Sequence, residues 1–148
     1  MKTLIVFDSV FGNTAEIAKA IGAAISTDVL FRRTDEVNPS DLEAMDLLIV
    51  GAPTYGGKPT PAMRSFLDTI PESAVQGIHV AAFDTRLATK LLRIIGYAAG
   101  DIAEMLKSKG GNLIIAPEGF IVKGKKGPLK EGETEHAANW GKELVGRL

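Results

Sequence analysis

Apolar residues form four short and nearly continuous runs along the chain, at residues 3–7, 47–50, 79–83 and 112–116. Runs of this length are typical of strands that are buried on both faces of a parallel sheet. A shorter and more polar run at residues 28–32 fits an edge strand of the same sheet. The pattern therefore predicts five strands.

Between these runs, apolar residues recur at helical spacing. The stretches at residues 17–25, 63–70, 99–106 and 137–148 each predict an amphipathic helix, and residues 38–45 predict a short helical turn. Strands that alternate with helices are typical of a parallel sheet with right-handed crossovers. We therefore expect a single three-layer α/β/α domain over the whole chain.

The composition narrows the possible functions. With 148 residues, 45% of them hydrophobic and 24% charged, the chain has the make-up of one soluble domain. The net charge of −1 argues against nucleic-acid binding, and we interpret the lysine-rich residues 123–130 as a solvated turn. No apolar run reaches the roughly 18 residues that a membrane span needs. Since cysteine is also absent, we expect a cytoplasmic protein.

The loop after the first predicted strand has the composition of an anion site. It reads SVFGNT, residues 9–14, and leads directly into a predicted helix. Gly12 permits close approach of the backbone, the N–H groups of the helix start favour an anion, and Ser9 and Thr14 add hydroxyl donors. The loop lacks the lysine of a GxxxxGK[ST] nucleotide loop, so a single terminal phosphate fits it better. The alternative is a helix start that these side chains merely cap.

Asp8, at the end of the first predicted strand, invites comparison with a phosphoacceptor. A receiver domain would need a carboxylate at the end of the third strand, where the sequence has Gly51. A haloacid-dehalogenase-type phosphatase would need a second aspartate in the place of Val10. We therefore expect Asp8 to order the loop or to face solvent.

A second loop, GAPTYGGKPTP at residues 51–61, should lie at the same edge of the sheet, because ligands of open α/β sheets bind beyond the carboxyl ends of the strands. Tyr55 can stack on a flat ring there, while Gly56 and Gly57 let the backbone approach the edge of that ring. Taken alone, the loop fits an ordinary turn better; the neighbouring anion site is what favours a flavin contact.

At these two loops the sequence resembles the flavodoxins. FDSVFGNTAEIA (residues 7–18) and GAPTYGG (residues 51–57) are similar to the loops with which that family binds FMN. The resemblance covers essentially the whole chain, and it implies the doubly wound strand order 2-1-3-4-5 described for flavodoxins as a class. It implies that the FMN phosphate is held by Ser9, Val10, Phe11, Gly12, Asn13 and Thr14. The flavin ring would be flanked by Pro53, Thr54, Tyr55, Gly56 and Gly57.

The third flavin loop departs from the family pattern. By position, Asp84, Thr85 and Arg86 should contact the flavin after the fourth strand, but no aromatic residue follows at once, and the role of Tyr97 is left open.

Two further points follow from the resemblance. The Gly56–Gly57 peptide matches the peptide that turns its carbonyl toward the flavin in flavodoxins. The net charge of −1 also differs from the strongly acidic family, so the redox partner cannot be inferred from the resemblance.

The favoured function is a small FMN-binding electron carrier that shuttles electrons between redox partner proteins, with no membrane or nucleic-acid partner. The alternative is an FMN-dependent NAD(P)H:quinone or flavin reductase on the same fold, with Arg86, Lys90 and Arg93 available to an anionic substrate. A third reading, a flavin-free interaction domain, requires the first loop to be empty.

Overall fold

The computed structural model describes residues 1–25, 28–88 and 96–148. Its strands are β1 (Thr3–Phe7), β2 (Val29–Arg33), β3 (Leu47–Pro53), β4 (His79–Leu87), β5 (Asn112–Leu113) and β6 (Glu118–Val122). Its helices are α1 (Asn13–Ile25), the 3₁₀ helix η1 (Pro39–Leu42), α2 (Pro61–Thr69), α3 (Glu72–Val75), α5 (Ala98–Ser108) and α6 (Glu133–Gly146). All the predicted helices are confirmed with shifted ends. The four-residue helix α3 is too short to show a helical period in the sequence.

The sheet is parallel, with the strand order β2-β1-β3-β4-β5. This order confirms the flavodoxin-like topology that the sequence resemblance implied. Every residue of β1 and β3 is buried, as expected for central strands that helices cover on both faces. The predicted edge strand β2 is only half-buried.

The fifth position of the sheet differs from the prediction. Only Asn112 and Leu113 of the predicted strand at residues 112–116 pair with β4, at its start. The unpredicted strand β6 pairs with the second half of β4, so two short strands share one position. Pro117 stands between them, and proline lacks the N–H group that a continuous ladder of hydrogen bonds would need there.

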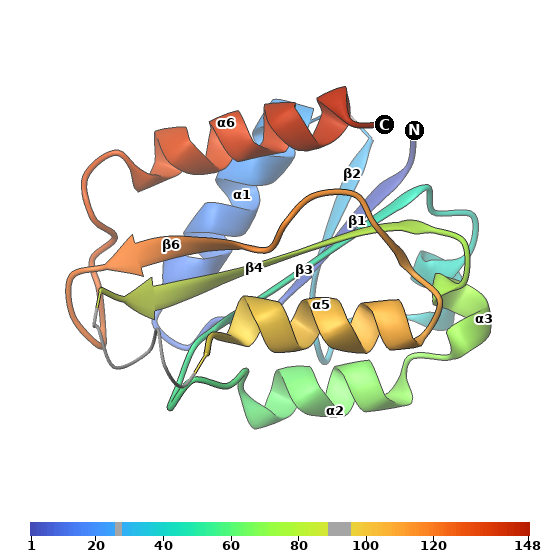
Figure 1. Ribbon diagram of the computed structural model, residues 1–148, viewed down its shortest axis with the longest axis horizontal. Coiled ribbons are helices and arrows are strands. Elements are labelled where there is room, and N and C mark those ends of the chain that lie inside the picture. The colour runs from blue at the N-terminus through green and yellow to red at the C-terminus, as the bar shows by residue number, and fades with distance from the viewer. Residues whose placement is uncertain (26–27, 89–95) are drawn as a thin grey trace.

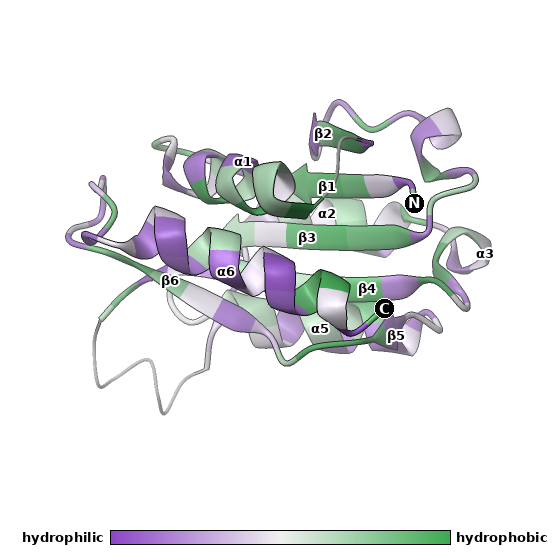
Figure 2. Cartoon of the chain, turned by 90° about the horizontal axis from the view of Figure 1, so that it is seen from above, coloured by the Kyte–Doolittle hydropathy of each residue, from purple (hydrophilic) through white to green (hydrophobic). Residues whose placement is uncertain are grey.

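Helices cover both faces of the sheet (Figure 1). Helices α1 and α6 pack against each other on one face, and α2 and α5 lie on the other. Figure 2 shows that the central strands β1, β3 and β4 are largely hydrophobic and that α6, which lies over them, alternates between hydrophilic and hydrophobic residues. None of the helices in the described part of the chain is long and apolar enough to cross a membrane.

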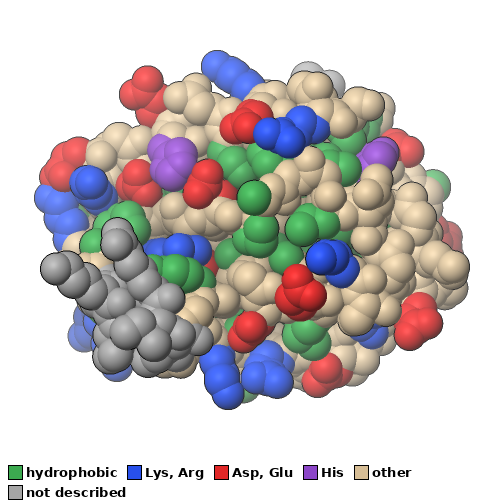
Figure 3. Space-filling view, in the orientation of Figure 1, with side chains coloured by type: hydrophobic (Ala, Val, Ile, Leu, Met, Phe, Trp, Pro, Cys, Tyr) green, Lys and Arg blue, Asp and Glu red, His purple; other side chains and the backbone are tan. Residues whose placement is uncertain are grey.

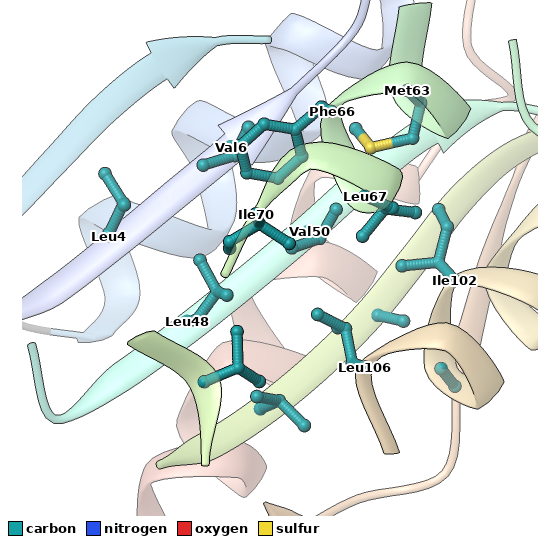
Figure 4. Close-up of a cluster of buried hydrophobic side chains, with 14 of the residues drawn as sticks. Leu4, Val6, Leu48, Val50, Met63, Phe66, Leu67, Ile70, Ile102 and Leu106 are labelled. Carbon is teal, nitrogen blue, oxygen red and sulfur yellow. The ribbon is translucent and has the colours of Figure 1, made fainter. Parts of the chain in front are cut away.

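Each face of the sheet has its own hydrophobic cluster. On the α2 and α5 side, Leu48, Val50, Leu67 and Ile102 belong to a cluster of completely buried side chains (Figure 4). Burial of each such side chain contributes about 1.5–3 kcal/mol. These clusters fix the strands in register and thereby hold the loops at the carboxyl edge in place.

The α1 and α6 side is closed by three aromatic rings. Trp140 of α6 packs on Phe83 of β4 and Phe120 of β6, with ring centroids 6.2–6.3 Å apart and edge-to-face geometry. Such pairs contribute about 0.5–1.5 kcal/mol beyond the burial of area. The contact anchors β6, and therefore the turn that follows it, to the rest of the domain.

Strand β4 is longer than predicted and ends at Leu87 rather than near Phe83. Beyond Phe83, β6 continues the hydrogen-bond ladder on its free side, so polar residues remain in extended backbone. Asp84, Thr85 and Arg86 are thus strand residues rather than loop residues. Because side chains alternate along a strand, Asp84 and Arg86 point to the α5 face, and Thr85 points to the α1 face.

Candidate functional site

A cleft of about 640 Å³ opens at the carboxyl edge of the sheet. Its walls come from the first loop, the second loop, the end of β4, and β6 with the turn after it. The lining residues are Ser9, Val10, Phe11, Asn13, Thr14, Pro53, Thr54, Tyr55, Gly56, Thr85, Arg86, Leu87, Val122 and Lys125. Most of the predicted site residues therefore meet in one place, whereas Gly12, Gly57 and Asp84 lie outside the lining.

The first loop presents backbone donors to this cleft. The Ser9 hydroxyl accepts hydrogen bonds from the N–H groups of Gly12 and Ala15, each at 3.2 Å, which fixes the shape of the loop. The neighbouring N–H groups have no hydrogen-bond partner among the described residues; they belong to Val10, Phe11, Asn13 and Thr14. Together with the dipole of α1, they form a site for an anion.

A pair of threonine hydroxyls forms the floor of the cleft. Oγ1 of Thr14 lies 2.8 Å from Oγ1 of Thr85, and both residues are almost fully buried. The pair uses one hydroxyl hydrogen for its own hydrogen bond, so the second hydrogen remains available to a ligand. Thr85 thus reaches the anion site from within β4, although the sequence placed it in a third loop.

The second loop is a tight hairpin at the mouth of the cleft. The N–H of Tyr55 donates to the carbonyl of Lys58 at 2.9 Å, and the N–H of Lys58 donates back at 3.1 Å. The two residues between them, Gly56 and Gly57, have φ values of +58° and +79°, the left-handed angles that a type I′ turn requires. The turn holds the Tyr55 ring at the cleft, where 37% of the residue stays exposed.

Asp8 links the first loop to the start of α2. Its carboxylate accepts a hydrogen bond from the hydroxyl of Thr60, and its N–H donates to the carbonyl of Gly51 at 3.1 Å. Burial raises the pKa of the Tyr55 phenol, and the negative charge of Asp8 raises it further. The phenol therefore remains a neutral hydrogen-bond donor at physiological pH.

Thr54 and Asp84 cap the start of α5 rather than presenting their polar atoms to a ligand. The Thr54 hydroxyl accepts the N–H of Ala98 at 3.0 Å, and Oδ2 of Asp84 accepts the N–H of Ala99 at 2.9 Å. Asp84 is completely buried. A carboxylate at this end of a helix also meets a favourable dipole. We conclude that Asp84 positions α5, whereas the sequence suggested a contact with the flavin.

Arg86 lines the cleft, but its charge is already paired. Its Nε and Nη2 donate to the two oxygens of Asp84 at 2.7 and 2.9 Å, and its guanidinium lies over the ring of Tyr97. The other two cations suggested for an anionic substrate, Lys90 and Arg93, lie outside the described residues.

Sequence reasoning missed Leu87, Val122 and Lys125, which also line the cleft. Leu87 and Val122 face the cleft because β6, which was not predicted, pairs with the end of β4. Lys125 lies in the turn after β6, and that turn had been interpreted from the sequence as solvated. Gly127 in that turn packs so closely on Asn13 that a Cβ atom would lie 2.6 Å from the amide oxygen. The turn therefore adjoins the first loop. The one sequence feature that could have indicated this close approach is the glycines among the lysines of KGKKGP, residues 123–128.

This fold and site define an α/β domain with a row of backbone N–H donors and an aromatic-lined cleft beyond the ends of its strands. Residues 4–93 match the family model of the flavodoxin domain. The chain belongs to the flavodoxin family. Flavodoxins bind FMN, so the family and its cofactor confirm what the sequence resemblance implied.

Individual relatives agree with this assignment. Flavodoxin 1 of Escherichia coli strain K12 is 31% identical over 114 residues, which span 76% of this chain and 65% of the relative. A flavodoxin from the domain Archaea superposes with a TM-score of 0.83 at 24% identity, covering 99% of this chain and 98% of its own. Oxidised flavodoxin 1 from Bacillus cereus gives 0.81 at 24% identity, covering 100% and 99%. The two structures are similar to this chain in fold.

Proposed function

We propose that this protein binds FMN in the cleft and carries single electrons between redox partner proteins. One observation carries the proposal: the same cleft holds N–H groups without a hydrogen-bond partner among the described residues and an exposed tyrosine beside a glycine turn. A cytoplasmic location, general for flavodoxins, is part of the proposal.

The residues present fit the phosphate of FMN. The dipole of an exposed helix contributes only about 0.3–1 kcal/mol per charge, so several donors have to act together. The N–H groups at the start of α1 and one hydroxyl hydrogen of the Thr14–Thr85 pair supply such donors. Lys125 lines the same cleft and has no acidic partner among the described residues, so it adds a positive charge opposite the dianion.

The remaining walls fit the flavin ring. Tyr55 presents an aromatic face. The turn beside it consists of Gly56 and Gly57, which have no side chains that would keep a ring at a distance. Leu87 and Val122 add apolar surface on the side of β4 and β6. When bound, FMN supplies reversible one-electron chemistry; the protein holds the ring, shields part of it from water and leaves one edge accessible to partners.

The reductase alternative has less support in the described residues. A nicotinamide or quinone substrate with anionic groups would need free cations above the ring. Arg86 is held by Asp84 and stacked on Tyr97, so it does not meet this need.

FMN titration of the flavin-free protein, followed by quenching of flavin fluorescence, tests the binding site. We expect FMN to bind at least about tenfold more tightly than riboflavin, because only FMN engages the anion cradle. Thr14→Val should reduce this preference, whereas Thr69→Val, an exposed threonine of α2, should not. Equal affinity for the two flavins in the parent protein would contradict the assignment of the first loop.

Turnover with NADPH separates the two functions. A carrier should oxidise NADPH only when a separate reductase is supplied, whereas the alternative enzyme would do so alone. Sustained oxidation by the FMN-loaded protein without a reductase would overturn the carrier proposal.

A further inference from the structure

Exposed lysines lie on two of the segments that surround the cleft. Lys58 lies in the hairpin of the second loop, Lys125 and Lys126 lie in the turn after β6, and Lys130 follows that turn. All four side chains are exposed. Figure 3 shows Lys and Arg side chains, with Asp and Glu side chains among them, at the end of the molecule where β4 and β6 end.

None of these four lysines forms an ion pair within the described part of the chain. Glu131, the acid nearest in sequence to three of them, pairs with Lys123, although the charge of Lys130 also helps to lower the pKa of Glu131. Exposed acids in these parts of the chain are Glu16 on α1, Asp35 and Glu36 beyond β2, and Glu131 and Glu135 after the turn. We call the four lysines, which make no ion pair in the described chain, the basic surface of a chain with a net charge of only −1.

Exposed apolar side chains adjoin this basic surface. Val10, Phe11, Tyr55 and Leu87 are 55%, 42%, 37% and 37% exposed, and all four line the cleft. The other large apolar residues with comparable exposure in the described chain are Met1 and Leu148, at the two ends. An apolar and aromatic centre next to a charged rim is the usual anatomy of a transient protein interface.

We propose that this basic surface, defined by Lys58, Lys125, Lys126 and Lys130, is the docking face for an acidic redox protein. The inference rests on the proposed function, because docking here brings a partner to the mouth of the FMN cleft. In each encounter the reduced flavin gives up one electron, and the partner's acceptor gains one. Opposite charges raise the rate of encounter and orient the partner, and added salt removes that advantage.

Titration of the ¹⁵N-labelled, FMN-loaded protein with two proteins of opposite charge tests this proposal without relying on redox activity. We expect an acidic plant-type ferredoxin to shift the amide signals of residues 56–58, 124–127, 129 and 130 at low salt, and salt at roughly 0.3 M to abolish the shifts. Basic cytochrome c should leave these signals unchanged. Preferential binding of cytochrome c at this surface would overturn the proposal.

Two charge-matched double variants locate the interaction. Lys126→Glu with Lys130→Glu should weaken ferredoxin binding at least about tenfold, because repulsion replaces attraction. Lys107→Glu with Lys142→Glu makes the same change in net charge on the outer faces of α5 and α6, and it should leave the affinity within about twofold. Equal loss in both variants would mean that only net charge matters, which would contradict a defined docking face.

The outcome for docking is separable from the outcome for FMN binding. If the protein does not retain FMN, the proposed function fails before a partner is added. If FMN is retained but ferredoxin shifts no signal of the basic surface, the docking proposal alone fails.

Discussion

The guanidinium carbon of Arg86 lies 3.4 Å from the centroid of the Tyr97 ring. The same side chain makes two hydrogen bonds to the carboxylate of Asp84, which in turn accepts the N–H of Ala99. On β6, a Cβ atom at Gly119 would fall 2.1 Å from the guanidinium carbon, so only glycine leaves room for the stack. The charge of Arg86 is thus balanced inside the protein, and α5 begins where this cluster places it.

Arg86→Ala should therefore act on stability more than on redox potential. It leaves the completely buried Asp84 without its cation, and breaking such a pair costs about 3 kcal/mol in unfolding free energy. Because Asp84 and Tyr97 hold the guanidinium, and because Asp84 lies outside the cleft lining, we expect the flavin potential to move by less than about 60 mV, equivalent to 1.4 kcal/mol for one electron. Urea denaturation and potentiometry provide the two measurements.

The matched control for this change is Arg147→Ala, which removes an exposed pair with Glu143. It should cost less than about 0.5 kcal/mol. A large shift of potential with unchanged stability in Arg86→Ala would show that Arg86 acts directly on the flavin, as the sequence first suggested.

Lys125 and Lys126 are neighbours with different expected roles. Lys125→Met should weaken FMN binding about fivefold and leave riboflavin binding unchanged, because FMN alone of the two flavins carries the phosphate that this charge attracts. Lys126→Met, which removes an exposed lysine outside the cleft lining, should affect neither ligand. Fluorescence titration of both variants with both flavins checks this, and parallel losses for FMN and riboflavin would contradict a role at the phosphate.

Gly56 is required for its backbone angle and not for space. A Cβ atom at this position would meet nothing within 4 Å, but φ is +58°. Gly56→Ala should therefore destabilise the fold by about 1 kcal/mol, whereas Gly56→Asn should cost less, because asparagine tolerates left-handed angles. Denaturation curves of the two variants give the comparison, and an equal cost would point to a steric cause instead.

The raised pKa of Tyr55 predicts a pH dependence. Below the ordinary value of 10.0 the phenol is protonated in both the folded and the unfolded chain, so its favourable burial is fully present. That contribution is lost as the pH rises through the folded-state pKa. Asp8→Asn removes the smaller cause of the shift and should lower the pKa of Tyr55 toward its ordinary value.

Absorbance titration of the flavin-free protein measures this shift. The chain has two tyrosines, so a Tyr97→Phe background isolates the signal of Tyr55. An unchanged midpoint after Asp8→Asn would show that burial alone sets the pKa.

The central strands were predictable because their burial on both faces leaves an uninterrupted apolar run, as in Ile5 and Val6 or Leu48 and Ile49. The first two loops were predictable because a glycine and hydroxyl pattern lies next to a helix start. The division of the fifth strand position into β5 and β6 at Pro117 was not predictable, because β6 forms only by pairing with the polar second half of β4. The approach of Lys125 to the first loop depends on that pairing, and its one local signal is the glycines among the lysines of the turn.

The roles of Asp84 and Arg86 needed the structure for another reason. Their positions along the chain suggested a ligand contact, and both lie at the correct edge of the sheet. Because side chains alternate along a strand, both point toward α5. There Arg86 pairs with Asp84, and Asp84 accepts the N–H of Ala99 at the start of that helix. Position in sequence identified the edge but not the face.

Stepwise anaerobic reduction of the FMN-loaded protein, followed by its visible spectrum, tests the central claim most directly. A one-electron carrier should accumulate a half-reduced flavin midway, seen as a long-wavelength absorption band that rises and then falls. Direct bleaching from yellow to colourless, with no such band at any stage, would contradict one-electron transfer and favour two-electron chemistry.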